Sequence, residues 1–256
     1  MDYRTILVDL TTERSVATNA PVAINLADRF DATCIGLHVM SEPDPATSHP
    51  TAAPRAARDL VKAAFQRSAG SNARIEWTEA EGGPEQLLVE WALTVDLTVV
   101  AQHQPEGQSA PGIADELIMA SGVPTLMLPP QAATELGVTI LVGWNGSREA
   151  TRAVHEALPF LVRAQRAVVC AVGDVAISSL ESAVGMLRRH GVRAEPEAMD
   201  GPEAAAPEVL LRSARAHGAD LLVIGSYGHS PQRELLFGGV TRHMLRKAPL
   251  PVLFGS

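Results

Sequence analysis

Several kinds of segment are scarce or absent in this chain of 256 residues, and each absence narrows the range of functions. Lysine and arginine number 21 against 29 acidic residues, and no basic stripe occurs, so we expect no general nucleic-acid binding. No apolar run approaches the length of a membrane span, and the amino terminus lacks the pattern of a signal peptide. We therefore expect a cytoplasmic protein without a membrane partner, large enough for two small domains.

Cysteine and the common catalytic motifs are also scarce. Cys34 and Cys170 lie in apolar runs without CxxC spacing, which predicts buried free thiols in a reducing compartment. The chain has no GxSxG elbow, no HExxH metal motif and no GxxxxGK[ST] phosphate loop. His229 lies near Ser226, but no carboxylate is placed to orient this histidine. We therefore expect no catalytic residue, no metal site and no vigorous ATP hydrolysis.

What the chain does contain is an internal repeat. Three apolar segments of the first half return in the second half at offsets of 134, 124 and 127: Arg4–Val8 as Val138–Val142, Asp96–Val100 as Asp220–Ile224, and Val123–Met127 as Leu250–Phe254. Offsets this similar predict one fold written twice. We predict domains at residues 1–130 and 137–256, joined by a linker at residues 131–136.

Both halves alternate apolar segments with helical patterns. In the first half we expect strands near 4–9, 33–39, 73–79, 97–101 and 123–128, and helices near 16–30, 53–69, 84–93 and 112–121. In the second half we expect strands at 139–142, 167–172, 193–198, 221–224 and 251–254, and helices at 147–161, 178–190, 203–217 and 239–247. This alternation predicts an α/β fold in which helices cover both faces of a parallel sheet.

One predicted strand end in the second half carries a glycine-rich turn. Glycine permits positive φ angles and lets a ligand approach the backbone. A strand, a glycine turn and a helix amino terminus form an anion site, because unpaired N–H groups and the helix dipole point outward. This pattern predicts a phosphate-bearing small molecule beside four glycines: Gly225, Gly228, Gly238 and Gly239.

The spacing Gly225-x2-Gly228-x9-Gly238 resembles the nucleotide-binding signature of universal stress proteins, the UspA-like family. The segments Trp144–Ser147 and Ala248–Leu253 match their places around that signature. Because the similarity extends over both halves, the chain is identified as a tandem universal stress protein. The resemblance implies two doubly wound five-stranded parallel-sheet domains of the HUP type (adenine nucleotide alpha-hydrolase-like). It also implies a pseudo-dimer that pairs the strands at 124–128 and 251–254.

The resemblance implies a ligand for the second domain. In nucleotide-binding members ATP or AMP lies at the strand ends, so we expect ATP, ADP or AMP as a regulatory or adaptor ligand. No cofactor is expected to be obligatory, and Mg²⁺ would at most accompany the nucleotide. Carried onto this sequence, the glycines bring backbone amides to the phosphates, and Ser226 lies in the same turn. Thr241 offers a hydroxyl to phosphate, Asn145 faces the nucleoside, and Val172 lies near the base.

The sequence departs from the family pattern in both domains. Asn145 stands where an acidic residue is expected, and Gly239 where serine or threonine is expected. Because Gly239 keeps its amide, the missing hydroxyl should affect ATP more than AMP or ADP. In the first domain Ala101 and Gln104 replace the first two glycines, and Thr11 takes the acidic position. We therefore expect the first domain to have lost its phosphate site and to serve as a packing partner.

Two alternatives stay open. The chain could be an interaction module of the same fold in which both sites are empty, or it could be a weak ATP hydrolase. Asn145 can be interpreted as a ligand contact or as an Asx-turn residue before a helix with Ser147 as its N-cap, and the two roles are compatible. The sequence identifies no protein partner, and it leaves open a homodimer of tandem chains.

Overall fold

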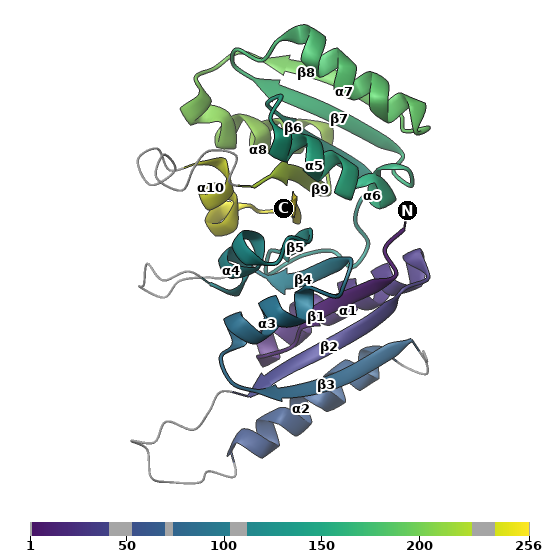
Figure 1. Cartoon of the computed structure of the whole chain (residues 1–256), viewed down its shortest axis with the longest axis vertical. Coiled ribbons are helices and arrows are strands. Elements are labelled where there is room, and N and C mark those ends of the chain that lie inside the picture. The colour runs from purple at the N-terminus through teal and green to yellow at the C-terminus, as the bar shows by residue number, and fades with distance from the viewer. Residues whose placement is uncertain (1, 41–52, 70–73, 103–111, 227–238, 256) are drawn as a thin grey trace.

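The structure of the protein is a computed structural model that describes residues 2–40, 53–69, 74–102, 112–226 and 239–255. The described strands form one ten-stranded sheet in the order β3-β2-β1-β4-β5-β10-β9-β6-β7-β8 (Figure 1). The first half contributes β1 (Thr5–Asp9), β2 (Thr33–Met40), β3 (Ile75–Glu81), β4 (Leu97–Ala101) and β5 (Thr125–Leu128). The second half contributes β6 (Thr139–Trp144), β7 (Arg166–Val172), β8 (Ala194–Met199), β9 (Leu221–Gly225) and β10 (Val252–Gly255).

Helices cover both faces of this sheet. One face packs under α1 (Glu13–Phe30), α2 (Ala53–Ala69), α5 (Arg148–Glu156), α6 (Leu158–Leu161) and α7 (Ile177–Arg189). The other packs under α3 (Pro84–Ala92), α4 (Ile113–Ala120), α8 (Ala206–His217, after a 3₁₀ turn at Glu203–Ala205) and α10 (Val240–Lys247). Side chains alternate between the two cores along β1, where Ile6 and Val8 face one and Leu7 the other. Strands buried on both faces explain the continuous apolar runs in the sequence.

The elements agree with the sequence prediction to within a few residues at their ends. Ser147 is the N-cap of α5, as predicted, and its hydroxyl oxygen accepts a hydrogen bond from the Ala150 N–H. The helix predicted at 147–161 divides into α5 and α6. Its division coincides with Pro159 in the first turn of α6, because proline cannot donate a helical hydrogen bond.

The register of the sheet reproduces the repeat. Ile6 pairs with Leu97, and Ile140, 134 residues further on, pairs with Leu221, 124 residues beyond Leu97. The next pairs, Thr98 with Thr125 and Leu222 with Val252, follow the offsets 124 and 127 in the same way. Equivalent residues of the two halves can therefore be identified from hydrogen-bonded register as well as from sequence.

The two halves join edge to edge through β5 and β10. Their pairing is antiparallel, whereas the pairings within each half are parallel, and it sets Val252 opposite Met127 and Phe254 opposite Thr125. This junction confirms the predicted pseudo-dimer. It also removes two exposed strand edges, since each half alone would present one there.

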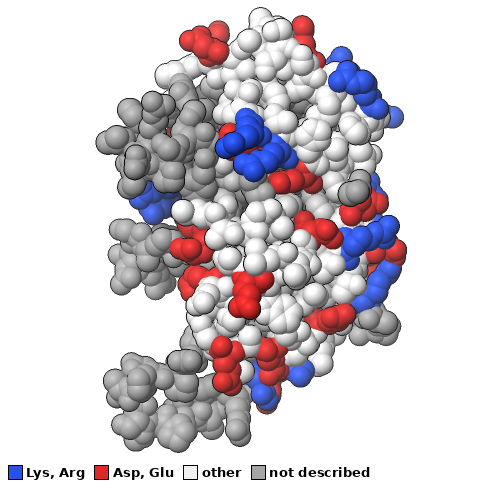
Figure 2. Space-filling model, viewed as in Figure 1, with Lys and Arg blue, Asp and Glu red and all other residues white. Residues whose placement is uncertain are grey.

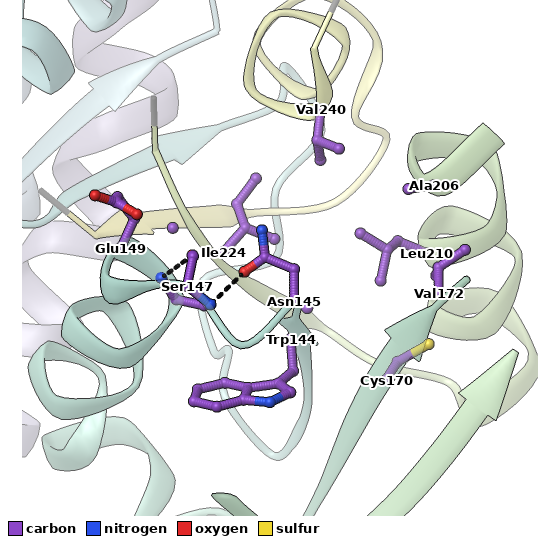
Figure 3. Close-up of a pocket in the computed structure, with 13 residues that line it drawn as sticks. Trp144, Asn145, Ser147, Glu149, Cys170, Val172, Ala206, Leu210, Ile224 and Val240 are labelled. Atoms are coloured by element: carbon purple, nitrogen blue, oxygen red, sulfur yellow. Dashed lines mark hydrogen bonds between the residues drawn. The ribbon is translucent and has the colours of Figure 1, made fainter. Parts of the chain in front are cut away.

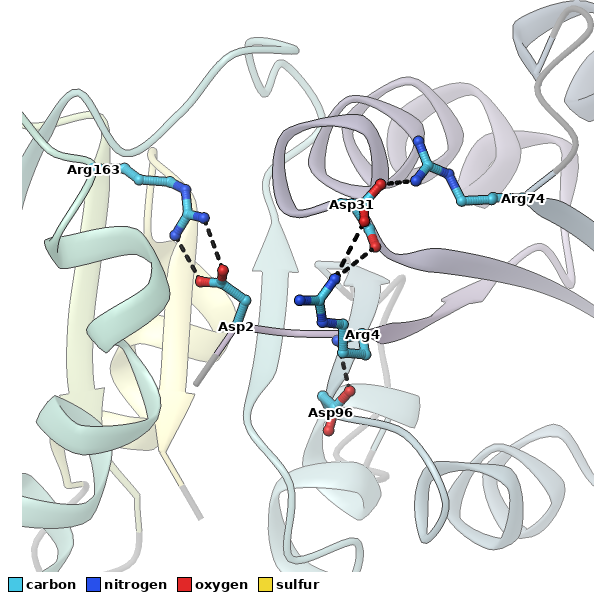
Figure 4. A network of polar contacts seen from close by, with 6 residues as sticks. All are labelled: Asp2, Arg4, Asp31, Arg74, Asp96 and Arg163. Carbon is cyan, nitrogen blue, oxygen red and sulfur yellow. Dashed lines mark hydrogen bonds and ion pairs between the residues drawn. The ribbon is translucent and has the colours of Figure 1, made fainter.

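A second set of contacts holds the halves together at the amino ends of the strands. The Arg163 guanidinium pairs with the Asp2 carboxylate at 2.7 Å (Figure 4). It also lies 5.1 Å from the centre of the Phe30 ring. The rings of Tyr3, Phe30 and Phe160 meet edge to face, with centroids 5.1 to 5.7 Å apart. These contacts fix the halves at one end of the sheet while the opposite end carries the candidate site.

The charged surface is mixed. In Figure 2 the lysine and arginine side chains form small separate groups among acidic ones on the visible face. Among the described residues, no helix is long and apolar enough to span a bilayer.

Candidate nucleotide site

A pocket lies at the carboxyl ends of β6, β7 and β9 in the second half (Figure 3). Its volume is about 110 Å³, which is less than the roughly 300–1,000 Å³ of pockets that enclose a whole drug-sized ligand. It can therefore enclose one part of a nucleotide and leave the rest over the strand ends. Its lining comes from strand ends and from the amino-terminal parts of three helices: Gly143, Trp144, Asn145, Ser147, Glu149, Ala150, Cys170, Val172, Ala206, Leu210, Ile224, Gly225 and Val240.

The amino terminus of α10 differs from the starts of α5 and α8, whose first turns each contain an acidic residue. Gly239 is its N-cap and has no side chain to bond the first N–H groups, and the first turn contains no acidic residue. Val240, the first helical residue, lines the pocket. The first N–H groups of a helix lack partners within the helix, and the dipole adds positive potential there. This end of α10 can therefore receive an anion.

The start of α5 is already capped. The Asn145 Oδ1 atom accepts a hydrogen bond from the Ser147 N–H at 3.1 Å. Asn145 therefore forms the Asx-turn that the sequence left open as one of its two roles. In Figure 3 its amide nitrogen points away from Ser147, toward the side of the pocket where Val240 lies. The residue can therefore hold the turn and still offer a donor to a ligand.

Gly225 has a packing role that the sequence did not reveal. A Cβ atom at this position would lie 2.5 Å from the Glu149 carbonyl carbon and 2.6 Å from the Ala150 nitrogen. The end of β9 therefore lies directly against the backbone of α5. This contact requires glycine whether or not a ligand binds, so Gly225 alone is no evidence for phosphate.

The remaining predicted residues divide between those at the pocket and those away from it. Val172 lines it, as do Gly225 and Asn145. Ser226 is buried, and both its N–H and its hydroxyl donate to the Gly255 carbonyl of β10, so the hydroxyl is engaged away from the pocket. Thr241 is 3% exposed and is not part of the lining. Gly228 and Gly238 lie outside the described residues.

Glu149 is a pocket residue that the sequence analysis missed. Its own backbone N–H, together with Arg148 at 3.0 Å and Arg152 at 4.0 Å, lowers the pKa of its carboxyl group. The rim thus carries a charged carboxylate next to two arginines. The position of Glu149 depends on the close approach of α5 to Gly225, and no sequence motif predicts that approach.

Cys170 forms part of the pocket wall and confirms the prediction of a buried thiol. Burial raises the pKa of this thiol to about 12, and burial does the same for Cys34. A protonated thiol of this kind is a poor nucleophile. Among the described residues, no group of three His, Cys, Asp or Glu side chains is arranged to hold a metal ion.

Polar side chains fill the corresponding strand end of the first half. Asp9 occupies the position equivalent to Gly143, is 4% exposed and accepts a hydrogen bond from the Thr11 N–H at 2.9 Å. The Asn19 amide donates to the Asp9 carbonyl at 2.9 Å. Burial raises the pKa of Asp9, although its hydrogen bonds to Thr11 and the nearby His38 act in the opposite direction.

Known proteins resemble this chain in sequence and in fold. Residues 202–254 match the model of the universal stress protein family. Universal stress protein Slr1230 of Synechocystis is 37% identical over 78 residues, which are 30% of this chain and 26% of that relative. The matched part thus spans about a quarter of the relative's length.

Two solved structures share the fold over almost the whole chain. A universal stress protein of Archaeoglobus fulgidus gives a TM-score of 0.75 at 14% identity and covers 98% of this chain and 95% of its own. A functionally unknown protein of Pseudomonas aeruginosa gives a TM-score of 0.61 at 15% identity, over 98% of this chain and 92% of its own. Residues 202–254 thus match the universal stress protein family in sequence, and almost the whole chain shares the fold of a solved universal stress protein structure.

Proposed function

We propose that the second half binds an adenine nucleotide, ATP, ADP or AMP, as a regulatory or adaptor ligand in a universal stress response. One observation carries the proposal: a pocket at the strand ends is lined by the first residue of α10, a helix whose N-cap, Gly239, has no side chain to bond the first N–H groups. The apolar part of the pocket, with Val172, Leu210 and Ile224, suits a purine base, while the α10 N–H groups suit a phosphate. The proposal includes a cytoplasmic protein without catalysis, obligatory cofactor or metal.

The composition of the site favours a nucleotide with few phosphates. Gly239 supplies no hydroxyl at the start of α10, and the Thr241 side chain is buried away from the lining. The α10 amides remain the main ligands for phosphate within the described part of the site. Each additional phosphate brings negative charge toward the Glu149 carboxylate at the rim. We therefore expect AMP and ADP to bind at least as tightly as ATP.

The first experiment is direct. Purified protein is denatured, and released nucleotide is identified by chromatography, after which fresh AMP, ADP and ATP are titrated by calorimetry. We expect a single site per chain that tolerates the absence of Mg²⁺. Absence of released nucleotide, together with no binding at millimolar concentrations, would reject nucleotide binding.

A second candidate is an interaction module whose two halves only present surfaces to a protein partner. Two observations favour it: the Asn145 oxygen is engaged by Ser147, and packing against α5 explains Gly225 without a ligand. Restoring the family pattern with Asn145→Asp and Gly239→Ser distinguishes the candidates. If the wild type binds no ATP and the double variant does, the interaction module is favoured. Binding by the wild type favours the nucleotide protein.

Weak ATP hydrolysis is a third candidate. It predicts slow phosphate release that disappears in Gly228→Val. Release that is unchanged in this variant would come from a contaminant or from hydrolysis elsewhere, and it would reject the hydrolase.

A further inference from the structure

We propose that Gln102 of the first half is a positioning residue for the nucleotide site of the second half, because it holds the carboxyl end of α10. This inference rests on the proposed nucleotide binding. Gln102 follows β4 directly, in the turn where the first half has lost the glycines of the family signature.

The register of the sheet shows that Gln102 and Ser226 are equivalent. Each follows the last residue of the fourth strand of its half, and each backbone N–H donates to the last residue of the neighbouring strand. Gln102 N–H bonds the Leu128 carbonyl at 2.7 Å, and Ser226 N–H bonds the Gly255 carbonyl at 3.2 Å. The backbones at these two positions thus make the same contact, and the side chains differ.

The two side chains reach different targets. The Ser226 hydroxyl returns to the Gly255 carbonyl beside it. The Gln102 amide nitrogen crosses to the second half and donates to the carbonyls of Met244 at 3.4 Å and Ala248 at 3.3 Å. The Met244 carbonyl lies in the last turns of α10 and also accepts a hydrogen bond from the Ala248 N–H at 3.1 Å, whereas the Ala248 carbonyl belongs to the C-cap residue of the helix.

This contact is buried. Gln102 is 8% exposed, Met244 is fully buried and Ala248 is 2% exposed. Water can hardly replace the amide at the buried Ala248 carbonyl, so removal of the amide deprives that acceptor of this donor, while the Met244 carbonyl keeps its bond from the Ala248 N–H. Helix α10 also lies at the junction of the halves, next to α4 in Figure 1, and shares a core with Val100 and Met127 of the first half.

The opposite end of α10 is the end that lines the pocket. From Met244 to Val240 the helix rises only about 6 Å, at about 1.5 Å per residue. A shift of the carboxyl end therefore moves the N–H groups that would hold the phosphate. The degenerate turn of the first half would in this way set the geometry of the site in the second.

The test compares three variants of the full chain. Gln102→Ser introduces the residue found at the equivalent position, Ser226, whose side chain is too short to contact α10. Gln102→Glu keeps the size but places acceptor oxygens against two carbonyls. Arg163→Met is the matched control, because it weakens the contact between the halves at the opposite end of the sheet. Melting temperature, AMP affinity by calorimetry, and hydrogen exchange of the ligand-free 240–248 segment are measured for each.

We expect AMP affinity to fall roughly fivefold or more in Gln102→Glu, less in Gln102→Ser, and less than twofold in Arg163→Met. Exchange of the 240–248 amides should be faster in the two Gln102 variants alone. The proposal is overturned if these variants lower the melting temperature but match the control in affinity and in exchange. If one Gln102 variant does not fold, the AMP affinity and hydrogen exchange of the other variant test the proposal.

The experiment tests the contact between Gln102 and α10 separately from nucleotide binding. If the wild type binds no AMP, nucleotide binding fails. Exchange in the ligand-free protein then decides whether Gln102 holds α10. Faster exchange confined to 240–248 supports the contact, and unchanged exchange rejects it.

Discussion

The two halves differ most clearly where their fourth and fifth strands end. In the second half Gly225 pairs with Gly255, and both glycines lie against the backbone of α5. At the equivalent pair in the first half stand Ala101 and Leu128. The missing side chains let α5 approach β9 and β10 closely, and this approach brings the start of α5 to the pocket rim. The two halves therefore share one fold, but their strand ends differ because the second half has glycine, without a Cβ atom, at both of these positions.

A second difference lies at the first strand of each half. The second half has Gly143 in the sheet and Asn145 in the turn, and Asn145 lines the pocket. The first half places a buried carboxylate, Asp9, at the position of Gly143 and uses it to hold the turn at Thr11. The same task of ordering the turn before a helix is done by an amide in one half and by a buried acid in the other. The amide borders an open pocket, whereas the acid lies buried at the position equivalent to Gly143.

The largest expected effect tests the close approach of α5. Gly225→Ala should lower the free energy of unfolding by about 1–3 kcal/mol, since the new Cβ would force β9 and α5 apart. Gly185→Ala in α7 is the matched control, because its Cβ would meet only the end of the Arg189 side chain at 3.6 Å. We expect that control to be neutral or stabilising by up to about 1 kcal/mol. Chemical denaturation measures both, and equal values would contradict the packing role of Gly225.

The next effect compares two aspartates that the repeat relates. Asp220 accepts hydrogen bonds from the N–H groups of Gly137, Val138 and Thr139, whereas Asp96 accepts from Arg4 and Thr5. Asp220 is also the more buried of the two. We expect Asp220→Ala to cost about 2 kcal/mol and Asp96→Ala about 1 kcal/mol in unfolding free energy. The reverse order in urea denaturation would show that these bonds do not control the strand starts.

The third effect concerns Asp9 and depends on pH. Burial raises the pKa of Asp9 in the folded state, while Thr11 and His38 oppose the rise and Glu85 adds to it. The folded state therefore holds the proton more tightly than the unfolded state, and stability falls as pH rises from about 3.9, the ordinary value, through the raised pKa. Asp9→Asn should remove this loss and stabilise the protein at pH 7 by roughly 1 kcal/mol. Thermal unfolding at pH 4 and pH 7 should show a gain at the higher pH only.

The smallest effect concerns the ion pair at the other end of the junction. The hydrogen bond from Arg163 lowers the pKa of Asp2 in spite of partial burial. A lowered carboxyl pKa contributes stability above its unfolded value, and that contribution is lost as pH falls through the folded value. Asp2 is one-third exposed, so we expect Asp2→Asn to cost at most about 1 kcal/mol at pH 7, and less in high salt. A loss that persists in 1 M salt would indicate packing rather than charge.

Much of the fold could be predicted from local pattern. Apolar runs, helix periodicity and the offsets between repeats gave the strands, the helices and their order, because each signal lies within one element. Even the edge-to-edge pairing of β5 and β10 followed from the resemblance to universal stress proteins. The sequence also placed Asn145, Val172 and Gly225 at the carboxyl ends of three predicted strands, and the structure brings all three to the pocket.

The sequence by itself determined the parallel sheet of each half and the end of that sheet where a ligand would bind, since strand direction fixes where the carboxyl ends meet. Only the tertiary structure decided which side chains face that end. It turned the Ser226 hydroxyl toward β10, brought Glu149 to the rim and extended Gln102 across to α10. Those outcomes depend on how closely helices from different parts of the chain approach the sheet. That distance is set by side-chain volume at contacts far apart in sequence, and no local pattern records it.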